Sequence, residues 1–140
     1  GRVILQTYLP DHPAIQAAAA HDYEGFYARE LAERQPLGYP PAMRLANVVV
    51  SATEAEAAAA GAVRVAAAVR AAVAPEDVTL VGPAPCPLER LRGRSRHHCL
   101  LKARAPAALE RVLWMLARRA DELVGAANRL EIDRDPLSML

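Results

Sequence analysis

The chain of 140 residues has two cysteines, six aromatic side chains and a single lysine. Cys86 and Cys99 lie in no CxxC pair, and histidines stand beside only one of them. This arrangement disfavours both a zinc site and a disulfide framework, and it is typical of a cytosolic protein with reduced thiols. Five of the six aromatic residues fall within the first 39 positions, so the two ends of the chain are expected to be packed by different kinds of residue.

Signatures of membrane insertion and of catalysis are also missing. The longest charge-free apolar run, residues 78–88, is too short to cross a bilayer and contains three prolines. The residues before Lys102 do not form a GxxxxGK[ST] phosphate loop, and GxSxG, HExxH and GxGxxG do not occur. We therefore expect no catalytic site in this chain. Asp133 and Asp135, next to a proline, are predicted to cap a turn and not to bind a metal ion.

The most distinctive stretch runs from Gly82 to Arg104, with the sequence GPAPCPLERLRGRSRHHCLLKAR. It carries six cations against one acidic residue, in a chain whose formal net charge is only +1. Guanidinium groups can bind phosphate oxygens in pairs, so the stretch predicts nucleic-acid contact through phosphates. It contains no aromatic residue, so base stacking would have to come from arginine, His97 or His98. The predicted DNA-binding residues are Arg90, Arg92, Arg94, Arg96, Lys102 and Arg104.

Four of these arginines recur at every second residue, and Gly93 between them is typical of a hairpin tip. In this interpretation Arg92 and Arg94 flank an exposed turn, while Arg90 and Arg96 stand lower on its two arms. Removing Arg92 and Arg94 together is expected to weaken DNA binding with little effect on folding. The alternative is a solvated loop whose charges contact nothing specific.

The first 43 residues predict a strand, two helices and a linker. Residues 2–9, RVILQTYL, are typical of a buried strand, and residues 13–20 of a short alanine-rich helix. A second helix is expected to begin at Asp22 and to carry an aromatic stripe. Gly38 suits its C-cap, and paired prolines then make residues 37–43 a stiff linker.

From Arg44 onward the order is strand, helix, strand, strand, helix, strand, which predicts an α+β fold of the ferredoxin-like, split βαβ kind. The expected strands are residues 44–53, 78–81, 98–104 and 128–133, with a proline-rich turn at 82–87. Thr53 and Glu56 are predicted to form a capping box at the first of these helices. Trp114 falls off the apolar stripe of the second, so it is expected to be partly exposed or to cover another part of the protein, such as residues 23–31.

Two long segments carry a family resemblance. GRVILQTYLPDHPAI with DYEGFYARELAERQPLGYPP resembles the end of the second helicase lobe and the exit linker of the PriA family of bacterial primosomal replication-restart helicases. GPAPCPLERLRGRSRHHCLLKA and DRDP resemble that family's C-terminal domain, which is similar to a ribosomal small-subunit protein with an extended hairpin. The resemblance implies a helicase-lobe tail at 1–36, a linker at 37–43 and a DNA- and partner-binding domain at 44–140.

The same resemblance implies binding of branched or forked DNA, with single-stranded DNA-binding protein and primosome proteins as partners. ATP, magnesium and zinc are implied for the parent helicase, whose ATP-site and zinc-binding residues do not occur in this chain, so no cofactor is expected here. In the family, basic and amide side chains at the start of the last helix contact the acidic tail of single-stranded DNA-binding protein. This chain has Pro106 and Glu110 at the comparable positions.

Two other functions stay open at this point. A ferredoxin-like regulatory or dimerisation module would bind a small ligand at a strand–helix junction, and the hairpin arginines would then be incidental. RNA binding rests on analogy with the ribosomal fold alone.

Overall fold

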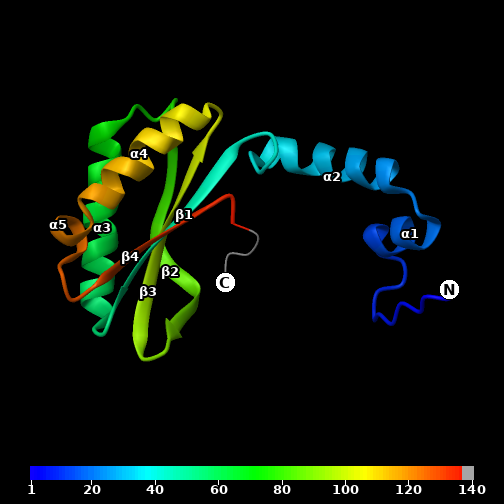
Figure 1. Ribbon diagram of the computed structural model, residues 1–140, viewed down its shortest axis with the longest axis horizontal. Coiled ribbons are helices and arrows are strands. Elements are labelled where there is room, and N and C mark those ends of the chain that lie inside the picture. Colours follow the sequence, from blue (N-terminus) through cyan, green and yellow to red (C-terminus); the bar gives the residue numbers. More distant parts are fainter. Residues whose placement is uncertain (137–140) are drawn as a thin grey trace.

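A four-stranded antiparallel sheet with helices on one side forms the main body of the computed structural model, which describes residues 1–136 (Figure 1). The strands are β1 (Arg44–Ala52), β2 (Thr79–Leu91), β3 (Arg94–Ala103) and β4 (Arg129–Arg134). The covering helices are α3 (Ala55–Ala72), α4 (Pro106–Arg118) and the short α5 (Ala120–Val124). The strand order β2-β3-β1-β4 with these crossovers confirms the predicted ferredoxin-like α+β fold.

The hydrophobic core lies between the sheet and its helices. Successive residues of a strand point to opposite faces, so Val48 and Val50 of β1 face the helix layer, where both are completely buried. Leu109 and Leu116 of α4 meet them from the helix side. No helix among residues 1–136 is long and apolar enough to cross a membrane. No helix of the described residues covers the other face of the sheet (Figure 1). We call it the open face.

Helices α1 (Pro13–Ala20) and α2 (Tyr23–Leu37) precede the sheet and extend away from it in Figure 1. His12 caps α1 by accepting a hydrogen bond at Nδ1 from the Ala14 amide, at 3.2 Å. Asp22 caps α2 by accepting one from the Gly25 amide at 2.9 Å. Gly38 ends α2 with a φ of 61°, the left-handed conformation that glycine adopts readily. Helix α2 therefore lies between the predicted capping residues Asp22 and Gly38, and α1 spans the predicted residues 13–20.

Residues 2–9 do not form the predicted strand. Val3 and Ile4 are 86% and 83% exposed, and no strand among the described residues pairs with this segment. The apolar pattern alone is not sufficient, because a β-strand forms only where a neighbouring strand accepts its backbone hydrogen bonds.

The predicted capping box is also wrong. Helix α3 begins at Ala55, so its N-cap is Glu54 and not Thr53, and no side chain bonds the free amides there. Glu56 then stands at the second helical position instead of the third, from which a capping box reaches back.

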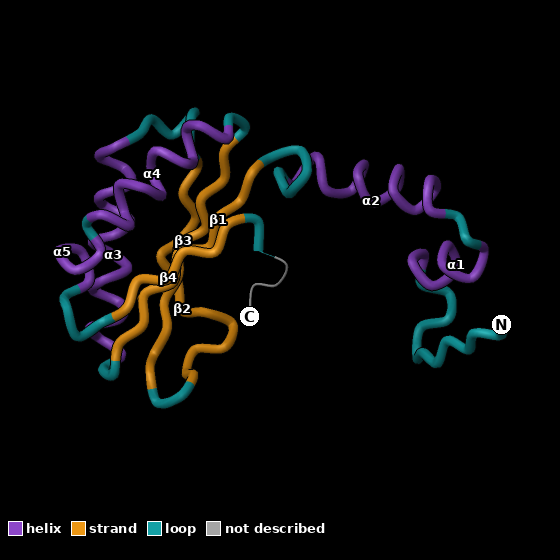
Figure 2. Tube along the Cα trace, viewed as in Figure 1, coloured by secondary structure: helices purple, strands orange, loops and turns teal. Residues whose placement is uncertain are grey.

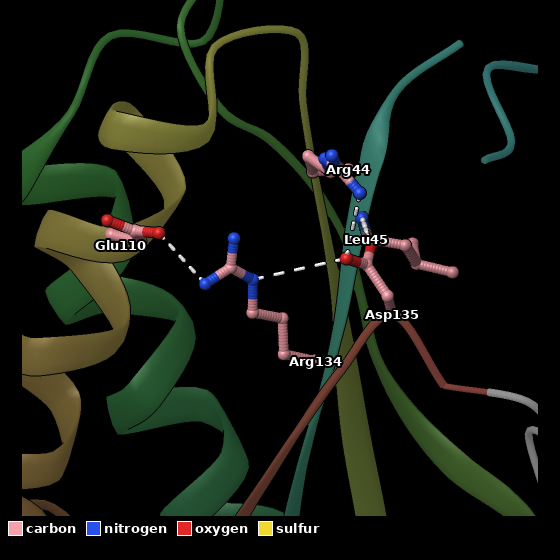
Figure 3. A network of polar contacts seen from close by, with 5 residues as sticks. All are labelled: Arg44, Leu45, Glu110, Arg134 and Asp135. Carbon is pink, nitrogen blue, oxygen red and sulfur yellow. Dashed lines mark hydrogen bonds and ion pairs between the residues drawn. The ribbon is translucent and has the colours of Figure 1, made fainter. Parts of the chain in front are cut away.

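A polar network connects the end of β4 to the start of β1 and to α4 (Figure 3). Asp135 accepts a hydrogen bond from the Leu45 amide at 3.2 Å and pairs with the Arg44 guanidinium at 3.3 Å. Arg134 pairs with Glu110 of α4 at 2.8 Å. Asp135 thus does cap a backbone amide, as the sequence suggested, but the amide belongs to β1 and not to its own turn.

Candidate nucleic-acid interface

The predicted arginine hairpin exists, and its turn consists of Arg92 and Gly93. Their φ angles are 49° and 77°, and two consecutive positive values are typical of the type I′ turn that joins antiparallel strands. Leu91 and Arg94 are the first cross-strand pair below this turn. The glycine signal therefore located the tip correctly.

The arm formed by β2 differs from the prediction, because this strand does not stop at Val81 but continues through the prolines to Leu91. The pairing jumps from Pro85–His97 to Arg90–Ser95, so residues 86–89 stand opposite Arg96 alone. Proline has no amide hydrogen to donate, and an edge strand such as β2 tolerates it by bulging. Figure 2 shows this bulge bending away from the helix layer, and Arg96 holds it by donating from Nη1 to the Leu88 carbonyl oxygen at 3.3 Å.

Arg94 anchors the hairpin to the rest of the domain. Its Nη2 donates to the Ser51 carbonyl oxygen at 2.7 Å and to the Ala127 carbonyl oxygen at 3.3 Å, and its Nε donates to Ser51 Oγ at 3.3 Å. These bonds join β3 to the end of β1 and to the connection that leads into β4. These bonds engage Nε and Nη2 of the guanidinium, so we expect Arg94 to position the hairpin more than to bind phosphate. The sequence prediction that Arg94 contacts DNA stays a prediction.

Arg90 and Arg92 are exposed on the hairpin. Within residues 1–136, neither side chain makes a hydrogen bond or an ion pair. Their forked donors are therefore available to phosphate oxygens, which a guanidinium binds without reading the base.

Arg129, at the start of β4, joins the same end of the sheet and was missed by the sequence reasoning. Ser51 of β1 pairs with Arg96 on one side and with Arg129 on the other, so the two arginines flank Ser51 in one row across the open face. Arg129 is exposed. The ferredoxin-like topology could have revealed it, because that fold places the last strand beside the first, and Arg129 lies in the predicted last strand.

Lys102 and Arg104 lie apart from this group. They stand at or beyond the far end of β3, about 30 Å of strand from the turn. Lys102 Nζ donates to the Leu37 carbonyl oxygen at 3.1 Å and sits 4.5 Å from the centre of the Tyr39 ring. The only lysine of the chain thus connects the end of α2 and the linker to the sheet.

We expect the change Lys102→Met to loosen the linker more than it weakens DNA binding. An exposed cation–π contact and a hydrogen bond are each worth about 0.5–1.5 kcal/mol. Hydrogen exchange of the Ala42 and Met43 amides, which both donate to the Tyr39 carbonyl oxygen, should accelerate. Arg104→Met removes a cation from the same end without touching the linker, and should leave this exchange unchanged. Equal exchange in wild type and Lys102→Met would show that Lys102 does not hold the linker.

His97 and His98, which the sequence left open as stacking residues, are both half-buried, and this disfavours stacking on a base. His98 Nδ1 lies 3.1 Å from Asn47 Oδ1. Burial lowers the pKa of His98, and the charges of Arg96 and His97 lower it further, so the ring is neutral at physiological pH. The cysteines are free and buried, and burial raises the pKa of the Cys99 thiol to about 11. Neither thiol is poised as a nucleophile.

These elements define a ferredoxin-like domain with an arginine-bearing hairpin at one end of its sheet. A family model described as the primosomal protein N C-terminal domain matches residues 35–137. The chain belongs to this family, as the resemblance in its sequence implied.

Similar proteins occur in distant bacteria. The replication restart protein PriA of Bacillus subtilis (strain 168) is 36% identical over 141 residues, which cover 100% of this chain and 17% of that protein. The protein of the same name from Synechocystis is 35% identical, over 99% of this chain and 16% of its own length. That from Thermotoga maritima is 33% identical, over 99% and 18%. The chain thus spans about a sixth of the length of these relatives.

Proposed function

We propose that this chain is the DNA-binding C-terminal part of a bacterial replication-restart protein, and that it holds branched or forked DNA by its phosphates. The observation that carries the proposal is the group of arginines at one end of the sheet. Arg90 and Arg92 project from a hairpin that Arg94 fixes in place, and Arg96 and Arg129 flank Ser51 beside it. We call these four residues, Arg90, Arg92, Arg96 and Arg129, the hairpin-end arginines.

This geometry suits phosphate recognition more than base recognition. Phosphate contacts fix position and orientation on the nucleic acid, whereas sequence is read at base edges or by stacking. No aromatic side chain stands among the hairpin-end arginines, and His97 and His98 are half-buried. The interface would therefore recognise the shape of the DNA backbone. Of the six residues that the sequence proposed, Lys102 and Arg104 would make at most secondary contacts.

The activity and partners of a longer parent protein belong to the proposal as well. The relatives are named replication restart proteins, so we propose that the parent assembles primosome proteins in the bacterial cytoplasm. ATP, magnesium and zinc would act outside this chain. The proposed contact with single-stranded DNA-binding protein would need cations at other positions of α4. Pro106 and Glu110 stand where the family has basic and amide side chains, and Glu110 is already paired with Arg134.

A salt titration tests DNA binding against the regulatory-module alternative. A labelled fork and a duplex of equal length are titrated with the full chain at several salt concentrations, and fluorescence anisotropy reports binding. We expect tighter binding of the fork, and a slope of log K against log salt of roughly −1.8 to −3.6 for two to four phosphate contacts. Weak binding that hardly depends on salt would favour a module that binds a small ligand.

A further inference from the structure

The outer face of α4 presents the only tryptophan of the chain to solvent. Trp114 is 66% exposed, while Leu109, Val112 and Leu116 of the same helix are buried against the sheet. The prediction that Trp114 lies off the apolar stripe and is partly exposed is thus confirmed. A single exposed ring is common on a protein surface, so the charged side chains around Trp114 decide what this face can bind.

Trp114 lies in a shallow hollow of about 680 Å³ along this helix. The polar side chains that line the hollow fall into two groups. Arg119 is paired with Glu122 at 2.6 Å, and Glu110 is paired with Arg134 at 2.8 Å, so these charges are compensated. The remaining two are Arg111 and Arg118, which make no hydrogen bond or ion pair in the part of the chain that the structure describes.

The two uncompensated arginines stand on either side of the tryptophan. Arg111 precedes Trp114 by three residues and Arg118 follows it by four, spacings that place all three side chains on one face of a helix. The seven residue steps from Arg111 to Arg118 rise about 10 Å along the helix axis. Two long guanidinium side chains can therefore reach the phosphates on both sides of a single nucleotide lying on the indole ring.

We infer that this face of α4 is a second nucleic-acid site, which binds single-stranded DNA by stacking a base on Trp114 and pairing the flanking phosphates with Arg111 and Arg118. Proteins that bind single strands combine an aromatic platform with cations along the backbone. The bases of a duplex are stacked on each other inside the helix, so only an unpaired strand can use such a platform. The site is separate from the row of Arg96 and Arg129, because α4 covers one face of the sheet and this row lies on the other (Figure 1).

An acidic peptide is the other ligand with matching charge. Its affinity would depend on an apolar anchor enclosed in a well-packed pocket. The hollow on α4 is open and its ring is exposed, so it offers a flat stacking surface more than an enclosing pocket. The single-stranded nucleic acid is therefore the occupant that the geometry favours.

The fluorescence of Trp114 tests this inference directly, because no other tryptophan contributes to the signal. The full chain is titrated with a short oligo-dT, with an abasic strand of the same length and charge, and with a duplex. We expect saturable quenching by oligo-dT and little quenching by the other two. The change Arg111→Ala/Arg118→Ala should raise the quenching midpoint about tenfold and flatten its salt slope by roughly 1.4.

Two further variants complete the test. Trp114→Ala should weaken binding of a dye-labelled oligo-dT about 5- to 150-fold, as expected for the loss of one stacked base. Arg2→Ala/Arg29→Ala, which removes two positive charges from exposed positions outside the sheet domain, should leave the oligo-dT quenching midpoint within about twofold. Absence of quenching, equal quenching by the abasic strand, or stronger quenching by an acidic peptide than by oligo-dT would each overturn the inference.

Discussion

Replacing Arg90 and Arg92 together by alanine is expected to flatten the salt dependence of fork binding by roughly 1.4 to 1.8 in the slope of log K against log salt. Each phosphate contact releases counterions from the DNA, and each lost contact removes somewhat less than one unit of slope. The two side chains are exposed and contact no protein group in the described part of the chain. Stability should therefore change by no more than about 0.5 kcal/mol.

The matched control is the variant Arg2→Ala/Arg29→Ala, which removes the same charge from exposed positions outside the sheet domain. Both double variants lower the net charge equally, so a general electrostatic effect would appear in both. We expect the control to retain the wild-type slope. Anisotropy titrations at four or more salt concentrations, with thermal melts of each variant, give the comparison. If the Arg90/Arg92 variant bound the fork with wild-type affinity and slope while folded, the hairpin would not be the DNA-contacting element.

Features determined by local sequence could be predicted from it. Helix α2 lies between its N-cap Asp22 and its C-cap Gly38 because a side-chain cap and a left-handed glycine act within a few residues. The hairpin tip at Gly93 has the same local origin. The order of strands and helices followed from changes in hydrophobic period, and that order is sufficient to indicate the ferredoxin-like fold.

The features that the sequence did not reveal depend on contacts between distant residues. The side chains of Arg92 and Arg94 look equivalent in an alternating arginine run, yet only Arg94 meets acceptors that are 43 and 33 positions away. Lys102 reaches a carbonyl 65 positions earlier in the chain. The strand predicted at residues 2–9 is wrong for a related reason. Its apolar pattern is typical of a strand, but no strand among the described residues pairs with it. Charge and spacing in the sequence can indicate candidate binding residues. Hydrogen bonds to distant parts of the chain then determine which cations stay free to bind a ligand.

Arg94→Ala is accordingly expected to destabilise the domain by about 1.5–3 kcal/mol, unlike the changes at Arg90 and Arg92. Hydrogen bonds from a charged donor contribute about that much, and the Ser51 carbonyl oxygen would lose its 2.7 Å partner in a partly buried position. Chemical denaturation measures the loss as a lower midpoint with an unchanged m value. The same loss of stability should appear as faster hydrogen exchange of the backbone amides around Ser51 and Ala127.

Arg94→Lys distinguishes an anchoring role from a charge effect. Lysine keeps the positive charge but lacks the planar fork, so one ammonium cannot reproduce the guanidinium's simultaneous bonds to Ser51 and Ala127. If Arg94 is an anchor, the lysine variant should lose most of the stability that the alanine variant loses. It should also weaken fork binding, because a loosened hairpin no longer holds Arg90 and Arg92 in one place. Full stability of Arg94→Lys, with a DNA affinity lowered only in Arg94→Ala, would instead assign Arg94 to the phosphate-binding group, as the arginine alternation had first suggested.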